Sequence, residues 1–271
     1  MTSFSPKVHL CGSIGEVSDV AKKDILAILR SATASSGRGA SLALSGGSTP
    51  KILYSSLQDS KADLQHVKFF LGDERLVPLD CADSNYHMAF ECLLKDLPQE
   101  NLFPVVLGEA QESVTDPQTG EAEARKVAQV YEKQLLEHLP LATDAQSGSK
   151  IPVFDIVLLG FGSDGHTASI FPDSVAEHDE KNVVSVSFPS ITMKPKVWRV
   201  TLARHVIQHA KHVLVLACGK DKEWVVQGVL RDEVEGPAPV ARFLRGCKGS
   251  VTFILDGDAY GSSGKSGETK L

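Results

Sequence analysis

The sequence predicts an α/β protein built around a doubly wound, mostly parallel sheet. Short apolar segments of strand length alternate with amphipathic helical segments from residue 8 to about residue 255. Val153–Leu159 is a nearly continuous apolar run, which is typical of a parallel strand covered on both faces. The alternation continues on both sides of each polar connection, so these connections are not domain linkers. We expect one domain over residues 1–258 and a flexible tail, rich in Gly, Ser and Lys, over 259–271.

Local signals place the elements of the first half of the chain. Ser13 and Glu16 form a capping box in front of a helical pattern, and Pro50 suits the first position of a later helix. The expected strands are 8–11, 41–44, 67–71 and 105–107, and the expected helices are 17–29, 50–57, 84–97 and 121–138.

The second half repeats the pattern after the long apolar strand. The expected strands are 153–159, 183–186, 197–202, 213–217 and 251–255, and the expected helices are 221–230 and 240–244. In a doubly wound sheet, ligands bind outside the carboxyl ends of the strands. The loops that directly follow strands are therefore the places to search for chemistry.

Composition excludes several classes of function. The formal net charge of −6 argues against a surface that binds nucleic acid by charge. None of the five cysteines forms a Cys-x-x-Cys pair, so we expect the reduced thiols of a cytoplasmic protein rather than a zinc or redox site. Neither a secretion signal nor an apolar run of about eighteen residues is present, so we expect no membrane partner. The sequence leaves the oligomeric state open, and a monomer is compatible with it.

The first candidate loop, 45–50, reads Ser-Gly-Gly-Ser-Thr-Pro and joins a buried strand to a helix. Gly46 and Gly47 allow a ligand to approach the backbone closely, and the free amides of a helix start favour an anion. Ser45, Ser48 and Thr49 add hydroxyl groups beside them. The alternative is a tight turn in which Thr49 is an ordinary N-cap.

The second candidate loop follows the strand that ends in Phe69-Phe70-Leu71. Arg75 provides a planar guanidinium suited to a phosphate, and Asp73 and Glu74 can orient it or contact sugar hydroxyls. A solvated charged turn is the alternative.

The third candidate loop, 160–172, contains Gly-x-Gly-x-x-Gly directly after the apolar strand. We reject a dinucleotide site because Pro172 leaves barely two helical turns after the last glycine, and no strand ending in an acid follows about twenty residues later. His166 instead lies where glycines hold the backbone open, which favours a general base over a structural histidine. Asp164 is a candidate to orient it.

The fourth candidate segment carries Lys194, Lys196 and Arg199 into a strand. Arg199 alternates with inward apolar residues, so it faces either solvent or a site. His205, His209 and His212 lack the acid partner of a metalloprotease pattern, so we expect no metal site. We also expect no cofactor.

Four motifs in this order, LALSGGSTP, FFLGDER, FDIVLLGFGSDGHTASIFP and WRVTL, resemble those of the 6-phosphogluconolactonases. The resemblance covers residues 8 to about 255. Its third motif continues to Ser-Ile-Phe-Pro, where the related glucosamine-6-phosphate deaminases continue toward Asn-Glu-Pro. The resemblance implies a three-layer, Rossmann-like α/β/α sandwich without a nucleotide.

For the site, the resemblance implies that the 45–49 loop, Asp73 and Arg75 hold the phosphate or the sugar, and that Arg199 adds positive charge. It implies that His166 activates water to hydrolyse 6-phospho-D-glucono-1,5-lactone, in the second step of the oxidative pentose phosphate pathway. A lactone is an already activated ester, so water, one base and an oxyanion donor suffice.

Two other functions remain open at this stage. One is a sugar-phosphate deaminase or isomerase of the same fold, and the other is a sugar-phosphate-binding regulator without catalysis. The last three residues, Thr269-Lys270-Leu271, resemble the Ser-Lys-Leu peroxisomal address, which adds a peroxisome-type fraction to the expected cytoplasmic location.

Overall fold

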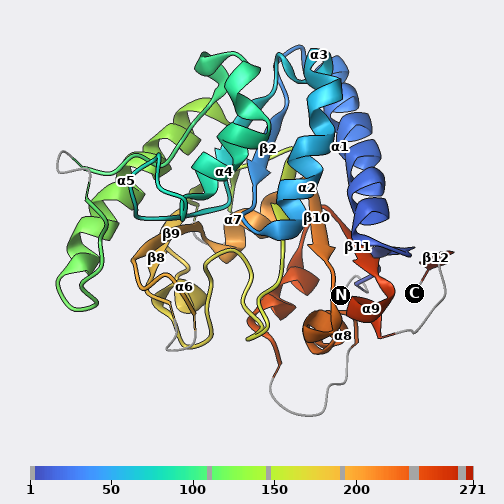
Figure 1. The fold of residues 1–271 in the computed structure, drawn as a ribbon. Coiled ribbons are helices and arrows are strands. Elements are labelled where there is room, and N and C mark those ends of the chain that lie inside the picture. The colour runs from blue at the N-terminus through green and yellow to red at the C-terminus, as the bar shows by residue number, and fades with distance from the viewer. Residues whose placement is uncertain are drawn as a thin grey trace.

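The structure is a computed structural model that describes residues 4–108, 112–144, 148–189, 193–231, 238–261 and 267–270, with backbone only for Ser36 and for the last of these ranges. It confirms the α/β prediction. A seven-stranded sheet runs through the molecule and helices pack on both of its faces, giving three layers (Figure 1). No helix in the described ranges is long and apolar enough to cross a membrane.

The central sheet has the strand order β12-β1-β11-β10-β7-β2-β3, and its pairs are parallel except for β12 with β1. From β2 the chain continues to β3 on one side, whereas from β7 it continues to β10 on the other. The neighbours β2 and β7 therefore form a topological switch point, where a crevice opens at the carboxyl ends of the strands. The strands are β1 (Lys7–Cys11), β2 (Ser41–Leu44), β3 (Lys68–Leu71), β7 (Ile156–Leu159), β10 (His212–Ala217), β11 (Ser250–Asp256) and β12 (Gly267–Lys270).

The direction of the crossovers distributes the helices over the two faces. The chain moves from β1 to β2 and β3 in one direction across the sheet, so right-handed crossovers place α1 and α2 on one face. It then returns through β7, β10 and β11, which places α5, α7 and α8 on the other face. The helices are α1 (Ile14–Ser36), α2 (Ser48–Leu57), α3 (Lys61–Leu64), α4 (Asn85–Cys92), α5 (Gly120–His138), α6 (Val175–His178), α7 (Arg204–His209), α8 (Glu223–Leu230) and α9 (Gly257–Tyr260).

The capping signal predicted for the first helix is present. The Ser13 hydroxyl accepts a hydrogen bond from the Glu16 amide at 3.2 Å, and the Glu16 carboxylate accepts one from the Gly12 amide at 2.6 Å. These contacts satisfy two amides near the start of α1, which is where helices lack internal acceptors.

A second sheet of three antiparallel strands adjoins the carboxyl end of β3. It consists of β4 (Asp73–Arg75), β9 (Arg199–Leu202) and β8 (Val184–Ser187), in that order. Gly72 joins the two sheets: its amide donates to the Leu44 carbonyl at 2.7 Å and its carbonyl accepts from the Leu202 amide at 2.9 Å. The small sheet is thereby fixed beside the crevice at the switch point.

Several local predictions are wrong. Residues 73–75 were expected in a loop but form β4, because Arg199 and Val200 provide a partner strand distant in sequence. Residues 105–107 form no strand, and Val106 is 41% exposed on the surface. The helix expected from Pro50 begins at Ser48 with Gly47 as its N-cap. The helix expected over 84–97 ends at Cys92, and the strand expected over 153–159 begins at Ile156.

The remaining helix-like segments are 3-10 helices. They are η1 (Gln58–Ser60), η2 (Leu94–Asp96), η3 (Gln99–Asn101), η4 (Lys220–Lys222) and η5 (Val240–Gly246).

Two further elements follow β11 in the described part of the chain end. Residues 257–260 form α9, and β12 pairs antiparallel with β1, which uses the edge of the sheet that β1 would otherwise leave open. Thr269 and Lys270 lie in β12, whereas Leu271 lies outside the described residues. The peroxisomal address stays a prediction.

Glu74 fastens α4 to the small sheet. Its carboxylate accepts hydrogen bonds from the amides of Arg75 (2.8 Å), Asn85 (2.7 Å) and Tyr86 (2.7 Å) and from the Ser84 hydroxyl (3.0 Å). Burial raises the pKa of Glu74 to about 7, although the four hydrogen bonds favour the charged form. This anchor sets the position of Asn85 at the start of α4.

We predict that Glu74→Gln lowers the free energy of unfolding by about 1–3 kcal/mol, because the amide nitrogen of glutamine cannot accept hydrogen bonds from the donors that it would face. Urea unfolding at pH 7 measures the change. Glu91→Gln is the matched control, since Glu91 is 56% exposed and lies 4.0 Å from Lys95; it should change stability by less than about 0.5 kcal/mol. Equal effects of the two substitutions would show that the hydrogen bonds of Glu74 do not stabilise the fold.

Candidate active site

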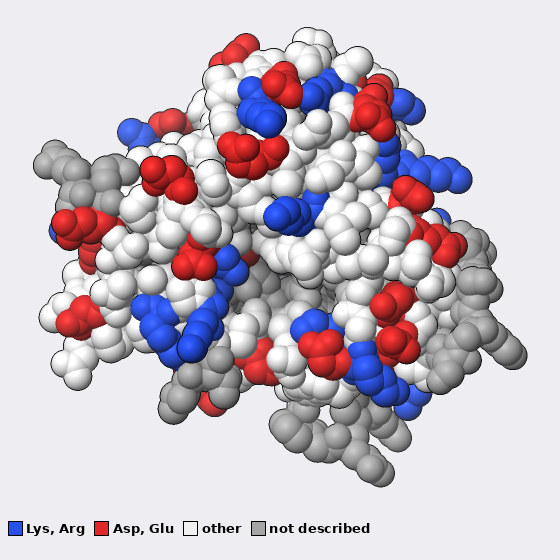
Figure 2. Space-filling view, viewed as in Figure 1, with Lys and Arg blue, Asp and Glu red and all other residues white. Residues whose placement is uncertain are grey.

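A cavity of about 260 Å³ opens at the carboxyl ends of β2, β3 and β7, at the switch point between β2 and β7. Figure 2 shows a hollow between the part of the molecule that carries β8 and β9 and the part that carries α8, with Lys and Arg side chains on both sides. Loops far apart in sequence thus meet at one place. The lining residues are Ser45, Gly46, Gly47, Asp73, Arg75, Asn85, Gly160, Phe161, Gly162, Ser163, His166, Ala168, Met193, Arg199 and Lys222.

His166 and Asp164 form a pair at one wall of the cavity. His166 Nδ1 contacts Asp164 Oδ1, and the imidazole and carboxylate are 12% and 22% exposed. Burial opposes the charge of Asp164, but the contacts with His166 hold the pKa of this carboxyl below its ordinary value. An ionised Asp164 accepts the Nδ1 proton, so the Nε2 atom of His166 is the one left to accept a proton from another molecule.

Glycine at position 162 makes this pair possible. A Cβ atom there would lie 2.1 Å from His166 Nδ1 and 2.6 Å from Asp164 Oδ1, which no side chain could tolerate. The Gly162 amide also donates to the His166 carbonyl at 2.8 Å, closing the turn. The glycines of the third motif therefore create space for a histidine rather than for a dinucleotide.

Arg75 and Arg199 face each other across neighbouring strands. They are register partners in the antiparallel pair of β4 and β9, the arrangement that brings side chains closest. Both Nε atoms are buried without a hydrogen-bond partner in the described part of the chain. The charge of Arg75 contributes to lowering the pKa of Arg199, as expected of two like charges that repel each other. An anion bound between the guanidinium groups would relieve this repulsion and satisfy the orphan donors.

The environment of Arg199 holds it in place. Its side chain is 3% exposed, and its guanidinium carbon lies 5.3 Å from the centre of the Phe171 ring. Burial lowers the pKa of Arg199 to about 10, with the charge of Asp73 acting in the opposite sense, so Arg199 remains charged at neutral pH. Asp73 is fixed in turn by the Ser169 hydroxyl, which donates to its Oδ2 atom at 2.6 Å. Phe171 also contacts His166, with ring centres 4.5 Å apart.

In the first candidate loop, Ser45, Gly46 and Gly47 line the cavity. Gly46 packs against Asn85, and a Cβ atom on Gly46 would lie 2.0 Å from the Asn85 side-chain oxygen. Gly47 has φ +109° and precedes the free amides of α2. Ser48 and Thr49 lie in the first turn of α2 and are not among the lining residues, and Thr49 contacts the Cys218 thiol instead.

Several lining residues were not predicted as site residues. Asn85 begins α4 and donates from Nδ2 to the Asp73 carbonyl at 3.0 Å, but its sequence neighbours carry no motif. Lys222 reaches the cavity from η4, beyond β10. Ala168 has φ +49°, an unusual conformation for a residue with a Cβ atom.

Lys194, from the fourth candidate segment, is exposed, and its carbonyl accepts a 3.4 Å hydrogen bond from Arg199.

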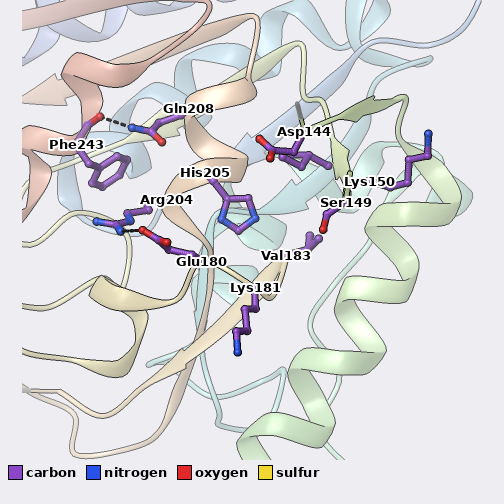
Figure 3. Close-up of a pocket in the computed structure, with 11 residues that line it drawn as sticks. Asp144, Ser149, Lys150, Glu180, Lys181, Val183, Arg204, His205, Gln208 and Phe243 are labelled. Atoms are coloured by element: carbon purple, nitrogen blue, oxygen red, sulfur yellow. Dashed lines mark hydrogen bonds and ion pairs between the residues drawn. The ribbon is translucent and has the colours of Figure 1, made fainter. Parts of the chain in front are cut away.

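A second cavity, of about 310 Å³, lies away from these residues. His205 points into it, and of its neighbours Arg204 pairs with Glu180 at 2.6 Å and Gln208 with the Phe243 carbonyl at 2.7 Å (Figure 3). No group of three or more His, Cys, Asp or Glu side chains in the described ranges could hold a metal ion. None of the predicted site residues lines this cavity.

A family profile described as "Glucosamine-6-phosphate isomerases/6-phosphogluconolactonase" matches residues 13–253. The chain belongs to this family. Within it, a protein of Synechocystis sp. named 6-phosphogluconolactonase is 32% identical over 230 residues, which cover 84% of this chain and 86% of that protein. The human protein of the same name is 34% identical over 220 residues, covering 79% and 77%.

Solved structures named 6-phosphogluconolactonase match this chain over almost its full length. The 6-phosphogluconolactonase from Leishmania guyanensis has a TM-score of 0.90 and 50% identity, covering 97% of this chain and 100% of that chain. The Trypanosoma brucei protein has a TM-score of 0.88 and 48% identity, covering 95% and 98%. A monomeric glucosamine-6-phosphate deaminase, with a TM-score of 0.66 and 21% identity over 94% of this chain and 99% of that chain, shares the fold alone.

We predict that inorganic phosphate stabilises the protein against thermal unfolding and that Arg75→Ala and Arg199→Ala remove most of this effect. A ligand at a hundred times its Kd adds about 2.7 kcal/mol to the folded state. Arg30→Ala is the control, because Arg30 is exposed, forms an ion pair with Asp63 and does not line the cavity. The same phosphate-dependent rise in Tm in all three variants would place the anion elsewhere.

Proposed function

We propose that this chain hydrolyses 6-phospho-D-glucono-1,5-lactone to 6-phospho-D-gluconate, with His166 as the general base. The observation that carries the proposal is the composition of one cavity: two opposed guanidinium groups on one wall and a histidine–carboxylate pair on another. The names of the relatives point to the same lactone. The reaction would be the second step of the oxidative pentose phosphate pathway, in the cytoplasm.

In this proposal the phosphate binds between Arg75 and Arg199. The orphan Nε donors and the repulsion between the two charges favour a dianion at that point. Gly46 and Gly47 of the first loop line the same cavity, where they let a ligand approach the backbone without side-chain bulk. Asp73 is placed to accept from sugar hydroxyls while it balances the charge of Arg199.

The lactone carbonyl then lies toward His166. Nε2 of His166 takes a proton from a water molecule, whose oxygen attacks the carbonyl carbon, and Asp164 stabilises the resulting imidazolium. The tetrahedral oxyanion collapses as the bond to the ring oxygen breaks, and the imidazolium returns its proton to that oxygen. Lys222 and the backbone amides at the cavity are the available donors for the oxyanion. No covalent nucleophile is needed.

We predict that Arg75→Ala and Arg199→Ala raise the KM for the lactone by roughly tenfold to a hundredfold, with little change in kcat. A charge-assisted contact to a phosphate is worth roughly 1.5–3 kcal/mol, and it is made equally in the ground and transition states. Steady-state kinetics, corrected for spontaneous opening of the lactone, measures both constants. Unchanged KM values in both variants would remove these residues from the site.

We predict that His166→Ala lowers kcat by roughly a hundredfold to ten-thousandfold and leaves the affinity for 6-phosphogluconate nearly unchanged, because the phosphate contacts come from other segments. In the unaltered protein kcat should fall on acidification, since a protonated imidazole cannot accept another proton. This fall of kcat at low pH should disappear in the His166→Ala variant.

The control for this substitution is His178→Ala, which alters a histidine whose side chain is 73% exposed. It should leave kcat unchanged. A folded His166→Ala protein with full turnover would disprove the assignment. Asp73 and Asp164 would then be the carboxylates to test; Glu74 is buried and does not line the cavity.

A further inference from the structure

The loop that carries His166 is held from its outer side by residues that follow β10. The Trp224 indole nitrogen donates to the Ser163 carbonyl at 3.0 Å, and the Ala241 amide donates to the Gly165 carbonyl at 3.3 Å. Pro239 packs against the same turn, 3.1 Å from where a Cβ atom of Gly165 would lie.

The contact between Trp224 and the loop is close. Gly165 has φ +88°, and a Cβ atom on it would lie 2.8 Å from Cη2 of Trp224. The indole ring is therefore seated directly on the backbone of Gly165. Gly165 is the residue before His166, and its amide donates to the Gly162 carbonyl at 3.1 Å. A shift of the indole would be passed to the backbone of the turn that presents the imidazole.

The exposure of Trp224 sets it apart from a core residue. Trp224 is 42% exposed, whereas the only other tryptophan, Trp198, is 4% exposed and donates to the Asp116 carbonyl at 2.8 Å. Trp224 is the second residue of α8, two residues after Lys222, which lines the cavity. Its ring is thus only partly buried, but its N–H group donates a hydrogen bond to a carbonyl of the His166 loop.

We propose that Trp224 is a positioning residue for the general base. This inference rests on the proposed function. Trp224 fixes the 160–166 loop from the outer side, and Phe171 contacts the imidazole from the inner side. The loop lies between these two aromatic groups. Catalysis by a base depends on sub-ångström placement, so a looser loop lowers kcat without weakening the phosphate contacts.

Two substitutions at Trp224 and one matched control test this kinetically. Trp224→Phe keeps an aromatic ring but removes the N–H donor, and Trp224→Ala removes both. We expect kcat to fall about threefold to tenfold in the first variant and roughly tenfold to a hundredfold in the second, with KM within about twofold. Trp198→Phe loses the same kind of hydrogen bond away from the His166 loop and should leave kcat unchanged. Unchanged kcat in both Trp224 variants, or an equal loss in Trp198→Phe, would overturn the proposal.

A readout independent of turnover is amide hydrogen exchange in the 160–166 loop. Exchange should become severalfold faster in Trp224→Phe than in the unaltered protein, and Trp198→Phe should not accelerate it. Unaltered exchange in Trp224→Phe would overturn the inference even if kcat fell. If the unaltered protein did not hydrolyse the lactone, the proposed function would fail, and the exchange data alone would still decide whether Trp224 holds the loop.

Discussion

Two guanidinium groups that oppose each other across a pair of short strands impose the main electrostatic constraint on this structure. Arg75 and Arg199 are opposite each other because β4 and β9 pair, and Gly72 ties β4 to the central sheet and to β9 at once. The surroundings of Arg199 therefore supply compensation, a carboxylate in Asp73 and an aromatic face in Phe171. The compensation is incomplete, because both Nε atoms keep an unused donor. A site that stores unsatisfied positive charge in this way is suited to bind an anion.

The opposite wall depends on space rather than on charge. His166 and Asp164 can touch only because position 162 has no side chain, and Gly165 can accept the indole ring only because it has none either. The same glycine spacing in a dinucleotide-binding protein brings the backbone close to a pyrophosphate. Here the space is used by protein side chains, which explains why the motif alone is a weak guide to function.

The features that the sequence predicted are those encoded by neighbouring residues. Buried strands followed by glycine-rich loops located the crevice, and Gly46, Gly47, Arg75, His166 and Arg199 do line one cavity. The missed features depend on distant partners. Residues 73–75 look like a polar turn until β9 pairs with them, and Asn85 acquires its place through Glu74. Ser48 and Thr49 lie in the first turn of α2 and do not line this cavity, so their part in the site stays a prediction.

The two walls also differ in how firmly their scaffolds hold them. Arg75 and Arg199 lie on paired strands, whose ladder of backbone hydrogen bonds fixes their separation. His166 lies on a loop whose internal bonds, from Gly162 to His166 and from Gly165 to Gly162, close the turn but do not fix it to the sheet. A loop of that kind needs contacts from other elements to hold a reacting group to a fraction of an ångström. Contacts from segments beyond β10 hold the loop on one side, and Phe171, which contacts both His166 and Arg199, links it to the wall that carries the two arginines.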